Sequence, residues 1–346
     1  MKTVLVCAVQ APFVTGGAEI LVRELARNLA QRGFRVDVVN VPFKWYPVSE
    51  IVRQALAWRL LDVTESDGTP VDLVVPTKFP SYLVRHPRKV AWLFHQHREA
   101  YDLHGTEYGS FGPGDEPTRQ AIRSMDDAGF AECRRVFTIS RNVADRLARY
   151  NGRAGEALYP PPQQVGRYRT DEYGDFLFYA GRLDPLKRLH LAVEAVARTR
   201  GPARLLIAGE GRLRGEIEKQ ARRLGVEDRV TLLGFVSDED LLALYARCRA
   251  TFYAPHNEDY GYVTVESFLS RKPVLTTTDS GGPLEFVTDG ENGLVTAPDA
   301  DAIAEGIDRL YAAPEARLRE MGERGHGRVC GITWDRVVDR LTESVR

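Results

Sequence analysis

This 346-residue sequence is poor in several signals that would assign it to a special class of protein. Its four cysteines, Cys7, Cys133, Cys248 and Cys330, lie far apart and form no Cys-x-x-Cys pair, so a reduced, cytoplasmic chain is expected. No apolar run is long enough to span a bilayer. The formal net charge of −1 excludes a general attraction to nucleic acid or to an anionic membrane.

Other absences narrow the choice further. The opening segment, residues 1–9, is soon interrupted by Gln10, so we expect a first strand there and not a signal peptide. No internal repeat of short period and no low-complexity tract is present. No Gly-x-Gly-x-x-Gly spacing follows the first strand, which disfavours a dinucleotide-dependent oxidoreductase. No cysteine cluster or histidine pair has established ligand spacing, so no metal site is expected.

The chain does have the length and patterning of two globular domains. It is 43% hydrophobic and 27% charged, and 346 residues exceed what one compact core usually holds. Short apolar runs alternate with helical patterns, which is typical of parallel sheets covered by helices. The sequence therefore predicts an α/β protein of two Rossmann-like doubly wound domains that face each other across a cleft.

The prolines at 160–162 mark the expected boundary, because successive prolines cannot join a helix or a central strand. We expect an N-terminal domain at 1–162, a C-terminal domain at 163–332, and a last helix at 333–346 that crosses back to the first domain. In the first domain the predicted strands are 4–9, 35–41, 71–75, 89–94 and 135–139, and the helices 18–31, 48–61, 116–133 and 142–150. In the second the strands are 176–180, 204–208, 230–233, 251–254, 273–277 and 293–295, with helices at 189–199, 213–224, 238–247 and 263–270.

The stretch 256–266 has the features of an anion site. A predicted strand leads into it and a predicted helix leads out. Gly261 has no Cβ and precedes the helix, so the backbone N–H groups of the helix start can approach an anion closely. Glu258 and Glu266 flank this turn and would accept hydrogen bonds from hydroxyls. A ligand with hydroxyls and phosphate, such as a nucleotide sugar, suits the arrangement; the alternative is that both carboxylates are solvated surface charges.

A second turn in the same half offers positive charge. The strand 176–180 is followed by Gly181, Arg182 and Lys187. A guanidinium binds phosphate as a planar fork and an ammonium binds it as a point charge. Glycines also follow the next two predicted strands, and carboxyl ends of parallel strands share one edge of a sheet, so these turns should line one crevice. Alone, two basic loop residues are more often surface charges.

In the first half, polar residues again follow predicted strands. Gly16-Gly17 opens the first helix, where a plain tight turn is the alternative. His95 ends the strand 89–94, and its alternatives are a structural histidine or, with His97, a metal ligand. Residues 102–117 are rich in glycine and proline, and we expect a mobile loop with acceptor contacts there. A basic end is formed by Arg134, Arg135, Arg141, Arg146, Arg149 and Arg153.

Such a basic set is usually a solvated face. The alternatives are a weak contact with the inner face of a membrane and the binding of an acidic acceptor.

On these residues the chain resembles the GT-B glycosyltransferases of family 4, which retain anomeric configuration and need no metal. The resemblance covers essentially the whole chain. It rests on the segment 181–187, on the Glu-x7-Glu pair Glu258 and Glu266, on the segment 16–19 and on His95. It implies transfer of a hexose from a nucleoside-diphosphate sugar, UDP- or GDP-linked, to a hydroxyl of a glycan, lipid-linked or small-molecule acceptor in polysaccharide or glycoconjugate biosynthesis.

The resemblance also implies roles for single residues. His95, Glu258, Arg182 and Lys187 would be catalytic, with the two cations on the diphosphate, Glu258 against the donor sugar and His95 near the reacting carbon. Glu266 would bind the ribose. Gly16 and Gly17 would lie over the diphosphate, and Gly209 and Phe235 near the base. The donor site would be completed by Gly181 and by the backbone of Tyr260, Gly261, Tyr262 and Val263. On the acceptor side we expect His97, Arg98 and Tyr101.

One departure concerns the histidines, because His95-Gln96-His97 is not the commoner His-Asp or His-Thr pairing of the family, which leaves open which histidine faces the sugar. The expected mechanism needs no protein base, since the leaving phosphate takes the proton of the acceptor. No carboxylate pair is placed like that of a retaining glycosidase. The competing functions are a sugar-nucleotide epimerase of the same fold and a non-catalytic nucleotide-sugar binding protein.

Overall fold

The computed structural model describes residues 1–13 and 16–345, and it divides the chain into two compact units. The first unit comprises Met1–Gln163 together with Ile332–Arg346, and the second comprises Gln164–Gly331. Of the loop expected at 10–17, residues 14 and 15 lie outside the described part. No described helix combines the length and the apolar character needed to cross a membrane.

The first unit is built on parallel strands. Strands β1 (Thr3–Gln10), β2 (Arg35–Pro42) and β5 (Leu73–Pro76) pair in the order β2-β1-β5, and β6 (Val90–Leu93), β7 (Arg135–Thr138) and β8 (Glu156–Ala157) pair in the order β6-β7-β8. The two sheets meet at β5 and β6, where the Phe94 N–H donates to Thr77 O at 2.7 Å. A short antiparallel hairpin joins β3 (Glu65–Ser66) to β4 (Thr69–Pro70).

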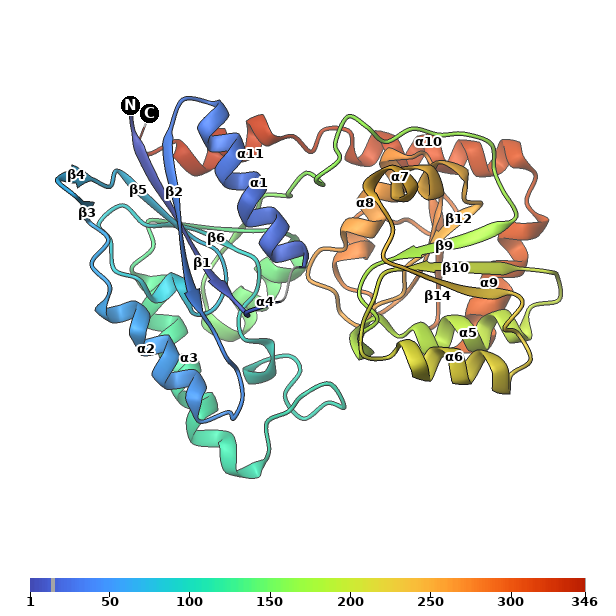
Figure 1. Cartoon of the computed structure of the whole chain (residues 1–346), viewed down its shortest axis with the longest axis horizontal. Helices are drawn as coiled ribbons and strands as arrows, with labels where there is room; N and C mark the ends of the chain where they lie inside the picture. The colour runs from blue at the N-terminus through green and yellow to red at the C-terminus, as the bar shows by residue number, and fades with distance from the viewer. Residues whose placement is uncertain (14–15, 346) are drawn as a thin grey trace. The chain divides into compact units, whose positions relative to one another are not determined.

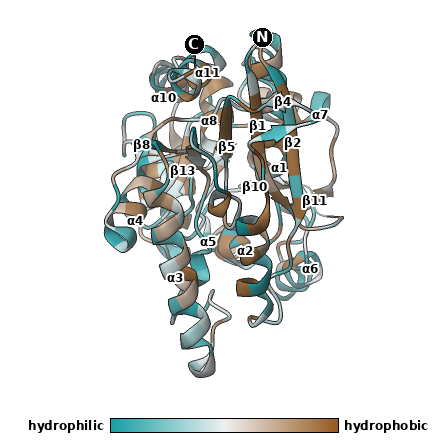
Figure 2. Cartoon of the chain, turned by 90° about the vertical axis from the view of Figure 1, so that its left-hand side faces the viewer, coloured by the Kyte–Doolittle hydropathy of each residue, from teal (hydrophilic) through white to brown (hydrophobic). Residues whose placement is uncertain are grey.

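Helices cover these strands on two sides (Figure 1). They are α1 (Gly17–Gln31), α2 (Glu50–Leu60), α3 (Glu116–Ala131), α4 (Arg141–Asn151) and α11 (Trp334–Thr342). Strands β5 and β6 are buried at every residue, as strands covered on both faces should be. In Figure 2, β1 and β5 are coloured as largely hydrophobic, whereas the helices carry polar residues as well.

The last helix, α11, packs on the first unit through one apolar face. Trp334, Val337, Val338 and Leu341 recur with helical spacing and are buried. The Trp334 ring meets the Trp92 ring edge-on, with centroids 6.2 Å apart. At its start, Asp335 accepts a hydrogen bond from Arg32 Nε of α1 at 2.9 Å.

The second unit holds one six-stranded parallel sheet in the order β11-β10-β9-β12-β13-β14. In chain order this is the 3-2-1-4-5-6 arrangement of doubly wound nucleotide-binding sheets. The strands are β9 (Phe176–Ala180), β10 (Arg204–Ala208), β11 (Val230–Gly234), β12 (Ala250–Phe252), β13 (Val274–Thr277) and β14 (Gly293–Thr296). The helices are α5 (Leu189–Arg198), α6 (Arg214–Arg223), α7 (Asp238–Arg247), α8 (Tyr262–Leu269), α9 (Ala300–Ala312) and α10 (Glu315–Val329).

The expected α/β class is confirmed, and the predicted strands and helices occur in the predicted order; the structure adds the short strands β3, β4 and β8. The strand predicted at 251–254 ends at Phe252, although Tyr253 still donates its N–H to Leu275 O at 2.9 Å. The mobile loop expected at 102–117 needs correction at its start, because Leu103 is buried and the Asp102 carboxylate pairs with Arg98.

Candidate functional site

The candidate site of the second unit lies at the carboxyl ends of β9 and β12. These neighbours stand where the strand order reverses, and open α/β sheets bind ligands at such a point. The loop after β9 brings Arg182 and Lys187, and the loop after β12 brings Glu258 and Gly261. Residues that the sequence separates by about 80 positions therefore meet at one edge of the sheet.

Lys187 and Glu258 form a direct ion pair across these two loops. Their side chains are 15% and 22% exposed, so the contact is shielded from water without being closed off. Lys187 Nζ also lies 3.3 Å from the Tyr253 hydroxyl. The pKa of this hydroxyl is raised, chiefly by burial and next by the negative charge of the Glu258 carboxylate. Arg182 is held more loosely: its side chain is 62% exposed, and its Nε lies 3.2 Å from Asp184 Oδ2.

Helix α8 begins at Tyr262, at the end of the loop that carries Glu258. Gly261 is its N-cap and has φ 88°, a left-handed conformation that glycine adopts most easily. A Cβ at Gly261 would lie 2.9 Å from Pro283 Cγ and 3.0 Å from Tyr253 Cε1. Only glycine therefore lets the chain turn into the helix here, and the first N–H groups of the helix are presented at the edge of the sheet where the two cations lie.

Glu266 lies one turn inside α8, as the sequence predicts, but its surroundings are aromatic. The Tyr245 hydroxyl donates to Glu266 Oε2 at 2.7 Å. Burial raises the pKa of the Glu266 carboxyl, although hydrogen bonds from Tyr245 and Tyr168 act in the opposite direction. The alternative interpretation of Glu266 as a solvated surface charge is wrong, and the carboxylate is an acceptor whose position the phenols fix.

The glycine turns at the carboxyl ends of β9, β10 and β11 are joined to one another by backbone hydrogen bonds. Gly181 N–H donates to Ala208 O at 3.0 Å, and Gly209 N–H donates to Gly234 O at 2.7 Å. A Cβ at Gly209 would lie 2.0 Å from Gly181 O, so no larger residue fits without moving the loops. Phe235 follows this ladder with its ring 84% exposed, which leaves an aromatic face available to a planar ligand.

Arg188 is a residue that the sequence interpretation passed over. It is 5% exposed, and its guanidinium donates to Ala254 O, to Pro255 O and to both Asp279 oxygens at 2.7–3.0 Å. It thereby ties the loop after β9 to the loops after β12 and β13. Its position in a loop beside Lys187 gives no sign of burial, and no periodic signal marks a buried arginine in a loop.

In the first unit, Gly16 is the N-cap of α1, as expected for the glycine pair. Its N–H donates to Glu19 Oε2 at 2.9 Å, and Lys78 Nζ donates to Glu19 Oε1 at 2.8 Å. Burial alone would raise the pKa of Glu19, but the hydrogen bond and the charge of Lys78 outweigh it and lower the pKa. The sequence analysis did not single out Lys78, which follows β5, as a partner of Glu19. The signal that could have found it is a basic residue just after a buried strand.

The two histidines after β6 have different surroundings. His95 Nδ1 lies 2.8 Å from the Gln96 carbonyl oxygen, which can only accept, so Nδ1 carries a proton and donates it to this carbonyl. His97 instead packs against the rings of Phe79 and Phe111, with centroids 5.5 and 5.6 Å away. Burial lowers the pKa of His97 to about 4. The geometry favours His95 as the histidine that meets a ligand.

A buried polar network holds the segment that carries His95. The side chain of Gln96 is fully buried, accepts from Arg146 Nε at 3.2 Å and donates to Asn151 Oδ1 at 3.0 Å. Asn151 in turn donates to the Tyr101 hydroxyl at 3.2 Å, and Tyr101 donates to the Asp126 carboxylate at 2.8 Å. These hydrogen bonds therefore hold Gln96 in place, and the backbone carbonyl of Gln96 in turn holds the His95 ring.

This network bears on the residues expected at the acceptor side. Tyr101 is 3% exposed and its hydroxyl is used by Asp126 and Asn151, so it does not support a contact with an acceptor. Arg98 is bound to Asp102, with both side chains 11% exposed. Among the described residues, no group of three or more His, Cys, Asp or Glu side chains is arranged to hold a metal ion.

Comparisons with known proteins connect this geometry with a family. Residues 163–328 match the family model described as glycosyl transferases group 1. An uncharacterised glycosyltransferase of Methanocaldococcus jannaschii is 25% identical over 355 residues, covering 90% of this chain and 89% of that protein. A D-inositol 3-phosphate glycosyltransferase of Nocardia farcinica is 26% identical over 387 residues, with coverage of 95% and 84%.

Solved structures agree on the fold. Sucrose-phosphate synthase of Thermosynechococcus elongatus has a TM-score of 0.80 at 19% identity, covering 98% of this chain and 97% of that one. HepE of Anabaena in complex with UDP-glucose has a TM-score of 0.71 at 18% identity, with 99% of both chains covered. Residues 163–328 thus match the glycosyl transferases group 1, and the chain as a whole has the GT-B fold of the glycosyltransferases that it resembles.

Proposed function

We propose that this glycosyltransferase moves a sugar from a UDP- or GDP-linked donor to a hydroxyl of a glycan, lipid-linked or small-molecule acceptor, with retention of configuration and without a metal. One observation carries the proposal: where the strand order of the second sheet reverses, the Lys187–Glu258 ion pair joins the loop that also carries Arg182 to the loop that leads into α8. Arg182, Lys187 and the start of the helix are positive groups of the kind that bind a diphosphate.

The leaving diphosphate gains negative charge as the bond to the sugar breaks. Positive groups already in place lower the barrier, because they need no reorganisation at that moment. Lys187 is bound to Glu258 and Arg182 to Asp184. We infer that a donor phosphate recruits both cations, and that Glu258, next to Lys187, then faces the donor sugar.

The other end of the donor has its own contacts in this proposal. Glu266, oriented by Tyr245, accepts from the ribose hydroxyls, and the exposed ring of Phe235 lies under the base near Gly209. The UDP-glucose complex of HepE supports a uridine donor, since that protein shares the fold. For His95, the proposed role near the reacting carbon rests on the family 4 resemblance.

The retaining, metal-independent chemistry rests on the family 4 resemblance of the segments 181–187 and 258–266. In that chemistry the departing phosphate accepts the acceptor's proton on the same face of the sugar, so no protein base is required. We also propose that the protein works in the cytoplasm, because all four of its cysteines are free thiols.

A donor screen tests this proposal. Thermal melting is measured with UDP, GDP, ADP and dTDP sugars, and a donor at 100 times its Kd should stabilise the fold by about 2.7 kcal/mol. We expect the largest shift from a uridine or guanosine sugar, and a smaller one in Arg182→Ala. The anomeric configuration of the product, read by NMR, then tests retention. A shift seen only with adenosine or thymidine sugars, or an inverted product, contradicts the proposal.

A further inference from the structure

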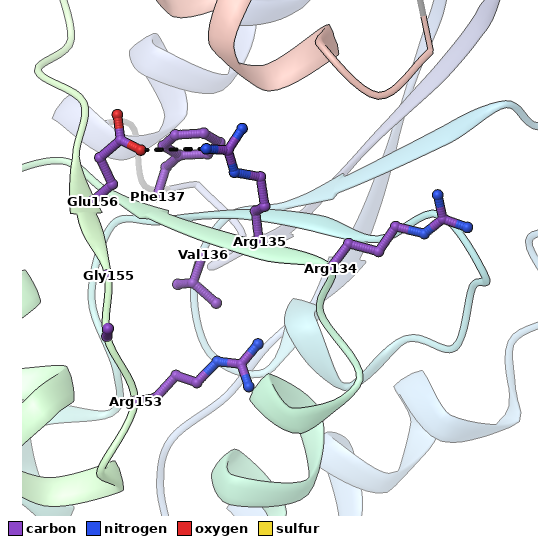
Figure 3. Close-up of a pocket in the computed structure, with 8 residues that line it drawn as sticks. Arg134, Arg135, Val136, Phe137, Arg153, Gly155 and Glu156 are labelled. Atoms are coloured by element: carbon purple, nitrogen blue, oxygen red, sulfur yellow. Dashed lines mark ion pairs between the residues drawn. The ribbon is translucent and has the colours of Figure 1, made fainter.

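Arginines of this chain are held in different ways. Beside a cavity of about 510 Å³ at β7 and β8, Arg134, Arg135 and Arg153 point in different directions (Figure 3). Arg134 is exposed, and its Nε donates to Pro87 O at 2.8 Å. Arg188 is the opposite case, because it is 5% exposed although it lies in the loop between β9 and α5. A guanidinium is costly to take out of water unless acceptors surround it, so the acceptors around Arg188 indicate what it does.

The backbone of Arg188 is strained. Its φ is 49° and its ψ is 39°, in the left-handed region that residues with a Cβ seldom adopt. Glycine adopts this region without a steric penalty. The strain is offset only if the side chain makes contacts that glycine could not make, and strained residues of this kind are frequent at functional sites.

The Arg188 guanidinium makes such contacts with all three of its nitrogens. Nε donates to Ala254 O at 3.0 Å, and Nη2 donates to Pro255 O and to Thr277 Oγ1 at 2.9 Å. Nη1 and Nη2 each donate to one oxygen of the Asp279 carboxylate at 2.7 Å, which is the bidentate geometry of a guanidinium–carboxylate pair. The protein itself therefore occupies this guanidinium, and Arg188 fastens loops together and is no phosphate ligand.

The contacts of Arg188 hold the backbone that carries Lys187. Lys187 precedes Arg188 directly, and its own N–H donates to Asp184 O at 2.9 Å. On the other side of Lys187, the carbonyl oxygen of Leu186 accepts from His256 N–H at 2.8 Å. The Lys187 side chain thus extends from a segment that is bound to the loop after β12 through both of its neighbours.

The carboxylate of Asp279 belongs to the segment that supports Glu258. Asp279 O accepts from Asn257 N–H at 2.8 Å, and Ser280 O accepts from Glu258 N–H at 2.9 Å. Burial alone would raise the pKa of Asp279, but the hydrogen bonds and the charge of Arg188 outweigh it and lower the pKa. Arg188 and Asp279 thereby connect the two loops whose side chains form the Lys187–Glu258 ion pair.

We propose that Arg188 and Asp279 are positioning residues, which set the separation of the Lys187 ammonium and the Glu258 carboxylate. They contact no donor and act through the backbone of the loops after β9, β12 and β13. The catalytic consequence rests on the proposed function, which puts Lys187 at the diphosphate and Glu258 at the donor sugar. A displacement of about 1 Å at a reacting centre can lower a rate about 100-fold, so this separation matters for turnover.

Three variants of the full chain test the proposal. Arg188→Lys keeps the charge but cannot hold a carboxylate and two carbonyls as a planar fork does. Asp279→Asn is the milder change, because its side chain is 33% exposed and only the charge is removed. Arg249→Lys is the matched control: Arg249 is half-buried and donates to backbone carbonyls such as Leu310 O at 2.9 Å, but it lies at the amino end of β12. Thermal melting checks that each chain folds.

The first readout needs no donor. The lysines are methylated with isotope-labelled formaldehyde, and the NMR signal of Lys187 is identified with Lys187→Arg. The Lys187 ammonium contacts Glu258 and lies 5.6 Å from the centre of the Tyr253 ring, so the signal reports its placement. We expect Arg188→Lys and Asp279→Asn to shift this signal and Arg249→Lys to leave it in place.

Two results of this measurement overturn the proposal. One is a Lys187 signal that stays in place in Asp279→Asn, which decides alone if Arg188→Lys does not fold. The other is a signal that moves by the same amount in the Arg249→Lys control, because the shift would then report a general loosening of the second unit.

Steady-state kinetics with the donor found in the screen give the second readout. Arg188→Lys and Asp279→Asn should lower kcat about tenfold to a hundredfold with a smaller change in KM for the donor, whereas Arg249→Lys keeps the wild-type kcat. Lower melting temperatures with an unchanged kcat would assign Arg188 a purely structural role and overturn the proposal. If wild type binds none of the donors, the proposed function fails, and the Lys187 signal still decides whether Arg188 positions the ion pair.

Discussion

Arg182 and Lys187 differ in how firmly the fold holds them. Lys187 is half-buried and bound to Glu258, next to the Tyr253 hydroxyl. Arg182 is exposed and shares a loop with its partner Asp184. An exposed pair of this kind contributes little to stability, so Arg182 is free to move toward a ligand at small cost. We therefore expect the loss of the Arg182 side chain to affect catalysis and not the stability of the fold.

We expect Arg182→Ala to lower kcat by about 10²–10³, because one charge-assisted contact to the departing diphosphate is lost. Arg204→Ala is a matched control, since Arg204 is also exposed and pairs with Asp175 at the same 3.2 Å. Steady-state kinetics of both variants are compared with wild type. A wild-type kcat in Arg182→Ala would contradict the assignment of the phosphate site.

Glu266 should behave differently, because the ribose does not change during the reaction. In Glu266→Gln we expect KM for the donor to rise about tenfold or more with kcat nearly unchanged, as a charged hydrogen-bond acceptor becomes neutral. Tyr245→Phe removes only the phenol that orients the carboxylate and should give a smaller rise. Loss of kcat at constant KM would place Glu266 at the reacting sugar instead.

His97 gives the first unit a dependence on pH. Its pKa is about 4 in the folded protein, below the 6.5 of an unburied histidine, because the folded ring is enclosed. Between these two values the unfolded chain binds more protons, so stability falls as pH drops from 6.5 to 4 and the loss is complete below 4. The loss amounts to at most about 3 kcal/mol.

His97→Phe should remove this dependence while keeping an aromatic ring among Phe43, Phe79 and Phe111. Urea denaturation of both chains at several pH values between 4 and 7 measures the difference in unfolding free energy. We expect that difference to shift in favour of the variant as pH falls. A constant difference would mean that His97 has the same pKa in the folded and the unfolded chain.

At the scale of elements, helix α8 owes its place to the glycine before it. The N-cap Gly261 combines φ 88° with close contacts to Pro283 and Tyr253, so the loop from β12 can turn sharply into the helix. The segment after β13 completes the support, since Glu258 N–H donates to Ser280 O at 2.9 Å and Gly282 N–H to Glu258 O at 2.8 Å. The proposed phosphate site thus lies at a junction of three loops.

Gly261→Ala should therefore destabilise the second unit by more than left-handed strain alone. Gly290→Ala is the matched control, because Gly290 has φ 73° but no atom within 4 Å of the Cβ position. We expect about 1 kcal/mol for the control, and a further 1–3 kcal/mol for Gly261→Ala. Donor binding should weaken only in Gly261→Ala. Equal melting temperatures of the two variants would show that the contacts at Gly261 yield without cost.

For the whole molecule, we expect turnover to persist in excess chelator. In the proposed site, Arg182, Lys187 and the start of α8 take the place of the divalent ion that supplies positive charge in metal-dependent transferases. The test is the initial rate with and without EDTA, and with added Mg²⁺ or Mn²⁺. Activity that disappears with EDTA and returns with either ion would contradict this expectation.

Much of the architecture was readable from local pattern. The apolar runs and helical periodicity predict the order of the strands and helices, because the central strands of a parallel sheet are covered on both faces, as in β5 and β6. Strands β9 and β10 and helix α7 have the predicted limits. The glycine turns at Gly181, Gly209 and Gly261 were also visible, since a glycine at the end of a strand has few other uses.

Local pattern alone predicts the fold class, the two α/β series and the segments that carry the candidate site. Which of those residues touch is visible only in the folded chain. It paired Lys187 with Glu258, placed Glu266 against Tyr245, buried Arg188 as a clamp, and withdrew Tyr101 into a polar network. The reason is physical: periodicity reports which residues face a core, whereas an ion pair or a buried hydrogen bond depends on loops that are distant in sequence and are brought together by strand order.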